Sequence, residues 1–388
     1  MIKKDLELSH YLIYPDSKEL SYYFSPGRIN IIGEHIDYNG GLVFPCAISL
    51  GTYGSISLRD DDTVNLYSAN FKQNNIISFK LSDDLTKDNL WSDYVKGVVS
   101  EIKQAGHKVT KGFNAYIYGN LPNGASLSSS ASLELFFAEV IRDINNLDLT
   151  DLDLVKISQK AENNFVGLHC GIMDQFAIGM SKKNHAILLD CATLKYDYAP
   201  LELGDNVILI MNTNKRRDLV TSKYNERCEE CAKGLELIKT NYKDVTHLCE
   251  LEETDLEEIS KFITDDVIYR RVRHVISEMD RVKKTFAALQ ANDIITVGKY
   301  INLSHKSLKE DYEVTGKELD TIVSLAQECE GVLGARMIGA GFAGCAIAIV
   351  NKNKVESVKR KVLAGYEKEI GYSADIYIAE SNDRTTKI

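Results

Sequence analysis

The segment at residues 25–41, SPGRINIIGEHIDYNGG, constrains the fold most, because it places an apolar run beside a dense group of ionisable side chains. Those side chains fall within ten positions: Arg28, Glu34, His35 and Asp37. The run at residues 29–32 is too apolar for an exposed loop, so it predicts a short buried strand that ends in a turn at Gly33. A strand and turn of this kind would gather the four side chains into a cluster able to bind a small polyhydroxylated ligand.

An ordinary surface ion pair is the alternative interpretation of this segment. Charge clusters beside turns are common and most are solvated, so Arg28 could pair with a carboxylate at the surface, with residues 39–41 as a plain loop. The segment alone leaves both interpretations open.

Length and composition favour a soluble globular protein with two domains. The chain has 388 residues, of which 44% are hydrophobic and 26% charged, and this excludes extended disorder. Its formal net charge of -10 gives no general attraction to nucleic acid or to an anionic membrane, so we expect neither as a partner. An anionic substrate would need a local positive site, such as the N–H groups at a helix start.

The cysteines and the N-terminal segment predict a reduced, cytoplasmic protein. The eight cysteines are dispersed, and several lie among apolar residues as small buried side chains would. Cys228 and Cys231 have metal-ligand spacing, but they lack a second pair and lie in a helical pattern, which argues against metal or redox use. The first ten residues have no apolar signal region, and no run approaches the length of a membrane span.

The order of apolar patterns predicts an α+β protein with two packed domains, at residues 1–200 and 201–388. The first half shows strand patterns at residues 43–58 and 113–118, followed by helical patterns at residues 129–144 and 152–165. The second half shows strands at residues 207–211 and 343–350, with helices at residues 224–242, 266–290 and 317–329. We place the boundary between residues 195 and 205, although no flexible linker marks it.

The loop at residues 122–131, PNGASLSSSA, lies between a strand candidate at residues 115–118 and the helix that begins near Ser129. Small residues let the backbone approach a ligand, and serines at a helix start offer hydroxyls beside free N–H groups, so the loop can cradle an anion. It matches neither the Walker nor the dinucleotide-binding pattern. A serine-capped helix preceded by a linker is the alternative.

Two further segments are candidates for the site: one contains an aspartate at a helix start, and the other is rich in glycine. Asp174 begins another apolar helical pattern, where it could act in catalysis or simply complement the helix dipole. The segment at residues 334–345 contains four glycines and precedes a strand. Such a density of glycine indicates tight turns or a backbone pressed against another element or a ligand.

Together these segments resemble the galactokinases of the GHMP kinase superfamily over nearly the whole chain. Residues 27–39, GRINIIGEHIDYN, are similar to the galactokinase signature, and residues 122–131 and 334–345 are similar to the second and third superfamily motifs. The resemblance implies a two-domain GHMP kinase-like fold, with a mixed sheet and helices in the N-terminal domain and an antiparallel sheet and helices in the C-terminal domain.

The resemblance also implies a role for each matching residue. Sugar ligands are implied at Glu34, His35, Asp37, Asp174 and Tyr224. Asp174 would be the catalytic carboxylate and Arg28 its cationic partner. The triphosphate would lie on Gly124, Ala125, Ser126, Leu127, Ser128, Ser129 and Ser130. Mg²⁺ would bind Ser130 and Glu162, and Ser68 and Trp91 would lie near the nucleotide base. The chain departs from the family pattern at Ser126, Ala340 and Ala343, where glycine is usual.

The expected activity is the ATP-dependent phosphorylation of D-galactose at C1, by a monomer that uses Mg²⁺. Glu34 and Asp37 can each accept from two hydroxyls, so we expect strong discrimination between galactose and glucose. Two alternatives stay open: a related kinase that acts on another sugar, and a galactose sensor that phosphorylates nothing. The presence of both Arg28 and Asp174 disfavours the sensor.

Overall fold

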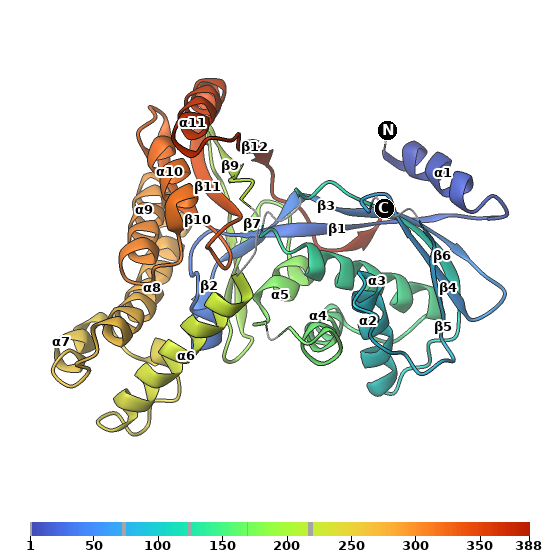
Figure 1. Cartoon of the computed structure of the whole chain (residues 1–388), viewed down its shortest axis with the longest axis horizontal. Helices are drawn as coiled ribbons and strands as arrows, with labels where there is room; N and C mark the ends of the chain where they lie inside the picture. The colour runs from blue at the N-terminus through green and yellow to red at the C-terminus, as the bar shows by residue number, and fades with distance from the viewer. Residues whose placement is uncertain (1, 72–74, 123–125, 169, 216–219) are drawn as a thin grey trace.

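The computed structural model describes residues 2–71, 75–122, 126–168, 170–215 and 220–388, without the side chains of residues 220 and 221. Its helices are α1 (Ile2–Ile13), α2 (Ser92–Gln104), α3 (Ser129–Asn145), α4 (Asp151–Lys160), α5 (Met173–Met180), α6 (Val220–Lys239), α7 (Leu256–Ile259), α8 (Asp266–Gln290), α9 (Ile294–Glu310), α10 (Gly316–Gln327) and α11 (Val355–Ile370). Figure 1 places α2 to α5 beneath the long strands on one side of the molecule and α8 to α11 on the other side.

The strands are β1 (Ser21–Asn30), β2 (Leu42–Val43), β3 (Pro45–Leu58), β4 (Thr63–Ser68), β5 (Ile77–Lys80), β6 (Phe113–Gly119), β7 (His185–Asp190), β8 (Tyr196–Pro200), β9 (Asn206–Asn212), β10 (Val332–Met337), β11 (Cys345–Asn351), β12 (Asp375–Ala379) and β13 (Thr386–Lys387). Short 3-10 turns lie at Asp37–Asn39, Leu248–Glu250, Glu253–Asp255 and Lys352–Lys354. A π-helical turn at Ala161–Val166 continues α4.

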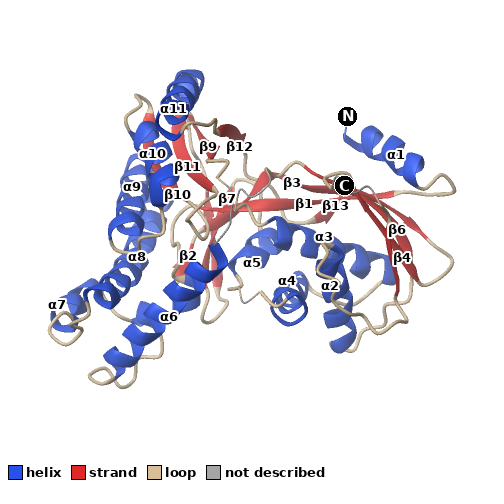
Figure 2. Ribbon diagram, in the orientation of Figure 1, coloured by secondary structure: helices blue, strands red, loops and turns tan. Residues whose placement is uncertain are grey.

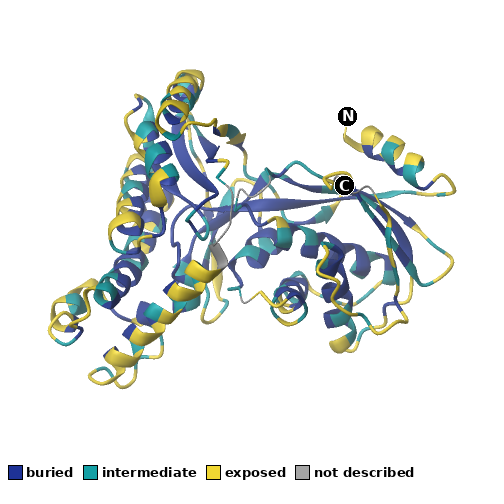
Figure 3. Cartoon of the chain, viewed as in Figure 1, coloured by how far each residue is buried: buried dark blue, intermediate teal, exposed yellow. Residues whose placement is uncertain are grey.

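The N-terminal sheet is mixed, as expected. Its order is β13-β1-β3-β6-β4-β5, and β4 and β6 run parallel while the other neighbours run antiparallel. Helices α3 and α5 pack on β1 and β3, whereas α1 lies across the other face of the sheet, against β3 and β6 (Figure 2). Most of β1 is buried along its length (Figure 3).

The C-terminal sheet is antiparallel, as expected, with the order β10-β11-β9-β12. Helices α9 and α10 pack on β10, and α11 packs on α10. A third sheet, β2-β7-β8, contacts α8. No helix within the described ranges is long and apolar enough to cross a membrane.

Helix starts follow from caps in the sequence. The Asp265 side chain accepts hydrogen bonds from the backbone N–H groups of Val267 and Ile268, which fixes the start of α8. Thr150 and Asp153 form a reciprocal capping box at the start of α4. Because these side chains satisfy N–H groups that no helix turn can satisfy, the two helices begin where their caps lie.

The structure corrects three expectations about local structure. The strand expected at residues 29–32 is the end of a longer strand, since β1 begins at Ser21 and ends at Asn30. Residues 31–32 bend but stay buried, because Ile31 N–H donates to the Phe44 carbonyl and Phe44 N–H donates to the Ile32 carbonyl. The helix expected at residues 152–165 ends as α4 and continues as the π-helical turn. Helices α1, α2, α7, α9 and α11 were not expected.

The division into residues 1–200 and 201–388 stays a prediction. One strand crosses it, because β13, at the end of the chain, pairs with β1 of the N-terminal sheet through the register Tyr23 to Lys387.

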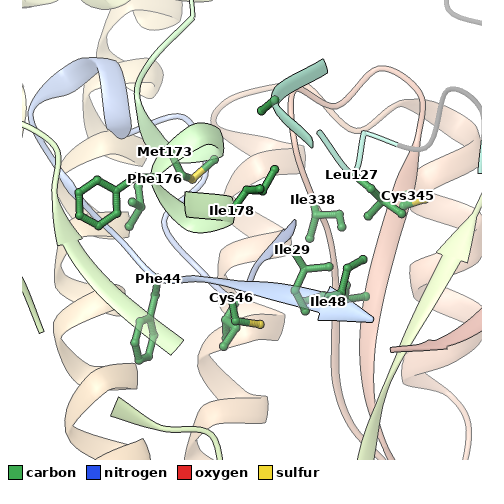
Figure 4. Close-up of a cluster of buried hydrophobic side chains, with 14 of the residues drawn as sticks. Ile29, Phe44, Cys46, Ile48, Leu127, Met173, Phe176, Ile178, Ile338 and Cys345 are labelled. Carbon is green, nitrogen blue, oxygen red and sulfur yellow. The ribbon is translucent and has the colours of Figure 1, made fainter. Parts of the chain in front are cut away.

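A hydrophobic cluster contains apolar neighbours of the predicted site residues, and Figure 4 shows part of it. Ile29, Leu127, Met173 and Ile338 all belong to it and are buried. Each of these apolar side chains is the chain neighbour of a predicted site residue or of the glycine turn. Because close packing holds a core side chain in place, the cluster fixes the backbone from which the neighbouring polar groups project.

Candidate active site

Two adjoining cavities collect most of the predicted site residues. The first, of about 290 Å³, is lined by all five predicted sugar ligands: Glu34, His35, Asp37, Asp174 and Tyr224. The second, of about 210 Å³, is lined by the described part of the serine-rich loop: Ser126, Leu127, Ser128, Ser129 and Ser130. Gly124 and Ala125 lie outside the described residues. Arg28, Asp174, Gly339 and Ala340 line both cavities, so they form the boundary between them.

Arg28 and Asp174 meet at this boundary although 146 positions separate them in the chain. Arg28 Nε and Nη2 each lie 2.8 Å from Asp174 Oδ1. The Arg28 side chain is 5% exposed and that of Asp174 30% exposed, so the pair is buried on the cationic side and open on the anionic side. The alternative of a solvated surface pair therefore does not hold for Arg28.

The serine-rich loop is tied directly to this ion pair. Ser128 Oγ donates to Asp174 Oδ2, and Arg28 Nη1 donates to the Ser126 carbonyl at 2.7 Å. Ser126 and Ser128 have φ values of 59° and 60°, in the left-handed region that favours glycine. The departure from the family pattern at Ser126 thus places a side chain where glycine is more easily accommodated.

Glu34 is a buried carboxylate that already accepts three hydrogen-bonding or ionic contacts. Oε1 lies 2.7 Å from the Gly339 N–H nitrogen and 2.7 Å from Arg336 Nη2, and Oε2 accepts from Asn30 Nδ2. A carboxylate has about four acceptor positions. Glu34 can therefore accept one further hydrogen bond rather than the two expected. Burial raises the pKa of Glu34, against the opposing effects of Arg336 and Arg28.

His35 is buried in the left-handed conformation, with φ 63°. Its ring lies among aromatic rings, with centroid distances of 4.9 Å to Tyr312 and 5.6 Å to Tyr224. Burial lowers the pKa of His35 to about 3, so the ring is neutral at physiological pH.

Asp37 is a carboxylate with a strongly raised pKa in the first cavity. Burial, reinforced by the charges of Asp174 and Glu34, raises the pKa of Asp37 to about 7. Its carboxylate packs on the backbone of Gly171, where an added Cβ would lie 2.3 Å from Asp37 Oδ2. Glycine at position 171 is therefore needed for Asp37 to hold this position.

Ser130, which lines the second cavity, and Glu162, which lines the first, form a pair of hard oxygen ligands. Glu162 is buried, hydrogen-bonds the Ser130 side chain and accepts from Gln175 Nε2 at 2.6 Å. The Glu134 carboxylate lies on the other side of Gln175, whose Nε2 donates to Glu134 Oε2 at 3.1 Å. Burial raises the pKa of Glu162, and the nearby Asp174 charge raises it further.

These donors fit a magnesium ion that also binds phosphate. Mg²⁺ prefers oxygen ligands and usually takes one or two carboxylates, with phosphate oxygens and water completing its shell. Glu134 Oε1 is buried without a hydrogen-bond partner among the described residues, so the site has spare acceptor capacity. No group of three or more His, Cys, Asp or Glu in the described ranges could hold a metal by itself.

The two residues expected near the nucleotide base lie apart from both cavities. Ser68 is buried at the end of β4, and its hydroxyl accepts from Asn70 N–H at 3.3 Å. Trp91 precedes α2, and its ring stacks on Phe71 at a centroid distance of 5.7 Å. Their place in a base site stays a prediction.

Three residues that hold the signature turn were missed in the sequence. Arg336, fully buried on β10, donates from Nη1 to the Ile31 carbonyl at 3.1 Å as well as pairing with Glu34. Glu278 on α8 accepts from Gly33 N–H at 3.0 Å, and His274 Nε2 donates to the Glu34 carbonyl at 3.1 Å. For His274 and Glu278, the signal was that ionisable residues occupy the apolar face of a helical pattern at residues 266–290, whereas Arg336 lies in the glycine-rich segment at residues 334–345.

Comparisons with known proteins agree with this geometry. Family models match three parts of the chain: a galactokinase galactose-binding signature at residues 10–58, a GHMP kinase N-terminal domain at residues 93–182 and a GHMP kinase C-terminal domain at residues 285–368. A galactokinase of Limosilactobacillus fermentum is 50% identical over 94% of this chain and 95% of its own length. A galactokinase of Ligilactobacillus salivarius is 52% identical over 94% of both chains.

Solved structures show the same fold. The crystal structure of Lactococcus lactis galactokinase complexed with galactose has 46% sequence identity, covers 100% of both chains and has a TM-score of 0.96. The mevalonate kinase of Methanococcus jannaschii, at 19% identity, covers 95% of this chain and 99% of its own, with a TM-score of 0.66, and shares the fold alone. The chain belongs to the galactokinases, a family of ATP-dependent sugar kinases within the GHMP kinase superfamily.

Proposed function

We propose that this protein transfers the γ-phosphoryl group of ATP to the C1 hydroxyl of D-galactose and forms galactose 1-phosphate and ADP. The observation that carries the proposal is the Arg28–Asp174 pair at the boundary of the two cavities. A pair in this position would contact the sugar hydroxyl in the first cavity and the phosphoryl group of ATP in the second. The galactose that accompanies the Lactococcus lactis relative supports the choice of sugar.

In the first cavity, Asp37, Tyr224 and the remaining acceptor position of Glu34 would bind sugar hydroxyls. Asp37 has more capacity than Glu34, because only the backbone N–H groups of Tyr38 and of Asp37 itself donate to its carboxylate in the contacts described. A buried acceptor that is left unpaired costs about 1 to 3 kcal/mol. An epimer that misplaces one hydroxyl therefore binds more weakly, which favours galactose over glucose.

The chemical step needs little covalent work from the protein. The C1 oxygen attacks the γ-phosphorus, the bond from that phosphorus to the β–γ bridging oxygen breaks, and ADP leaves with the electron pair. The hydroxyl proton passes to Asp174. Arg28 on Oδ1 and Ser128 on Oδ2 fix the orientation of this carboxylate, so Asp174 mainly orients the hydroxyl and takes its proton late.

The second cavity would hold the phosphates. Backbone N–H groups at the start of α3 and the Ser129 hydroxyl offer donors to an anion, and the Arg28 guanidinium offsets charge on the transferred group. Ser130 and Glu162 would hold Mg²⁺, which when bound neutralises phosphate charge. The monomeric state and the cytoplasmic location stay predictions.

An ADP-release assay with a panel of sugars tests the proposal. We expect turnover with ATP and D-galactose and little with D-glucose, and phosphorus NMR should identify a sugar 1-phosphate. Turnover of an N-acetylated galactose or of arabinose with none of galactose would assign the protein to a related kinase. Galactose binding without ADP release from any sugar would indicate a sensor.

A further inference from the structure

Both ring nitrogens of His35 are occupied by the protein itself. Nε2 lies 3.2 Å from the Ala340 carbonyl oxygen, and Nδ1 lies 2.9 Å from the Tyr38 hydroxyl. A carbonyl oxygen only accepts, so Nε2 carries the hydrogen. Because a neutral imidazole has one hydrogen, Nδ1 is then an acceptor and the Tyr38 hydroxyl donates to it.

The remaining hydrogens of this network follow in the same way. The Tyr38 hydroxyl lies 2.7 Å from the Tyr312 hydroxyl, and since Tyr38 gives its hydrogen to His35, Tyr312 donates to Tyr38. Cys231 Sγ lies 3.0 Å from the Tyr312 hydroxyl, so the thiol donates to it. Hydrogen bonds are thus donated in one direction, from Cys231 on α6 through Tyr312, Tyr38 and His35 to the Ala340 carbonyl. This series of hydrogen bonds fixes the orientation of the imidazole.

The Ala340 carbonyl belongs to the wall between the two cavities. Gly339 and Ala340 line both of them. On the sugar side, Gly339 N–H donates to Glu34 at 2.7 Å. On the phosphate side, Gly339 packs so closely on Ser126 that an added Cβ would lie 2.8 Å from Ser126 Cβ. Any displacement of residues 339–340 therefore changes the shape of both cavities.

We propose that His35 is a positioning residue whose imidazole binds the Ala340 carbonyl instead of the sugar, and so fixes the wall shared by the sugar and phosphate cavities. This inference rests on the proposed function for the identity of the two ligands. The family resemblance implied that His35 binds the sugar, and this inference gives its imidazole a different role. It also makes sugar affinity and nucleotide affinity depend on the same hydrogen bond, so a change at His35 alters both.

The first test detects the tautomer in the unaltered protein. Long-range proton–nitrogen NMR of protein labelled with ¹⁵N-histidine distinguishes a protonated ring nitrogen from an unprotonated one, and the spectrum of H35Q identifies the His35 signals among the eight histidines. We expect hydrogen on Nε2, and the same tautomer at saturating D-galactose. A hydrogen on Nδ1, or a tautomer that changes when galactose binds, would overturn the proposal.

The second test compares two variants by calorimetry with each ligand alone. Asparagine is too short to reach Ala340, whereas the glutamine amide nitrogen can occupy the place of Nε2. We expect H35N to weaken both D-galactose and a non-hydrolysable ATP analogue by about fivefold, as the loss of one hydrogen bond predicts. H35Q should restore both affinities to within about twofold of the unaltered protein. Weaker galactose binding with unchanged nucleotide binding in H35N would contradict the proposal.

Y38F serves if the His35 variants do not fold, because it removes one hydroxyl outside both cavities. The proposal predicts equal fold-changes in the affinities for galactose and nucleotide, and a loss confined to galactose would overturn it. The affinity for the ATP analogue is measured without sugar, so its change in the variants tests the role of His35 whether or not galactose is the substrate. Galactose turnover by the unaltered protein decides the proposed function separately.

Discussion

Glu34 shows how a carboxylate in a ligand cavity can hold the protein's own backbone together. The sequence predicted that Glu34, His35 and Asp37 gather at one place, because an apolar strand and a glycine turn leave them little freedom. It could not predict how many acceptor positions remain, since two of the three donors to Glu34, Arg336 and Gly339, lie about 300 positions away. Asp37 consequently has more capacity for a sugar than Glu34.

Replacing Gly171 with alanine should displace Asp37. The new Cβ would lie 2.3 Å from Asp37 Oδ2, and the carboxylate is the group that can move. We expect the KM for galactose to rise about tenfold or more, because a misplaced acceptor leaves a hydroxyl unpaired, while the KM for ATP changes little. Gly119→Ala is the matched control, since its Cβ would meet no atom closer than 3.7 Å. Equal KM values for galactose in G171A and the unaltered protein would contradict this role of Gly171.

Galactose affinity should fall as pH decreases through the range near 7. The pKa of Asp37 is raised to about 7, and only the ionised carboxylate offers all its oxygens as acceptors. We expect the calorimetric Kd for galactose to rise by up to about tenfold per pH unit below 7, with this dependence absent in D37N. A flat profile between pH 6 and 8 in the unaltered protein would argue against Asp37 as a sugar ligand.

The same pKa shift has a defined effect on stability without ligand. An acid whose folded pKa lies above its unfolded value contributes stability below the unfolded value, and this contribution is lost as pH rises to the folded pKa. Asp37 therefore reduces the free energy of unfolding progressively between about pH 4 and about pH 7. The D37N variant should lack this part of the pH dependence.

Helix α8 is the element that links the two halves of the site. Its bounds were predicted from apolar periodicity alone, and the structure adds that Asp265 caps its start. Its role in holding the signature turn was not predicted, because apolar periodicity does not depend on which groups the polar residues of a helix contact. His274 and Glu278 hold the backbone of the signature turn. The π-helical turn that carries Glu162 was also missed, since no propensity distinguishes it from an α-helix.

Replacing Glu278 with glutamine should destabilise the protein strongly. Burial alone would raise the pKa of Glu278, but Arg281 and the neighbouring His274 and Arg336 lower it to about 2, so the buried side chain is ionised. Breaking a buried ion pair typically costs about 3 to 5 kcal/mol. We expect a fall in Tm of roughly 5 °C and a raised KM for galactose.

Glu258→Gln is the matched control for this prediction. Glu258 and Lys261 have the same i,i+3 spacing as Glu278 and Arg281, but both are about 60% exposed. Exposed pairs contribute at most about 1 kcal/mol, so E258Q should melt close to the unaltered protein. Similar melting temperatures for E278Q and E258Q would show that the buried contacts of Glu278 with Arg281 and Gly33 contribute little to stability.

At the scale of the whole molecule, the last strand, β13, pairs with the first strand, β1. The sequence predicted a mixed sheet followed by an antiparallel one, because strand and helix patterns change near residue 205. The pairing of β13 with β1 could not be predicted, since a two-residue strand has no detectable periodicity. Long-range pairings of this kind follow from packing rather than from local preference.

A fragment of residues 1–200 should therefore not fold as an independent unit. It lacks β13, which pairs with β1, and α8, whose side chains hold the backbone at Gly33 and Glu34. We expect it to show no cooperative thermal transition by circular dichroism, whereas residues 1–388 show one. A cooperative transition in the fragment would show that the N-terminal half is stable without these contacts.

The central claim is that the Arg28–Asp174 pair performs phosphoryl transfer to galactose. The most direct measurement is the rate of ADP release by D174N at saturating ATP and galactose, together with its calorimetric affinity for galactose. We expect galactose to bind within about tenfold of the unaltered protein and turnover to fall by at least about 100-fold, as removal of a general base predicts. Turnover near that of the unaltered protein, with galactose still bound, would contradict the claim.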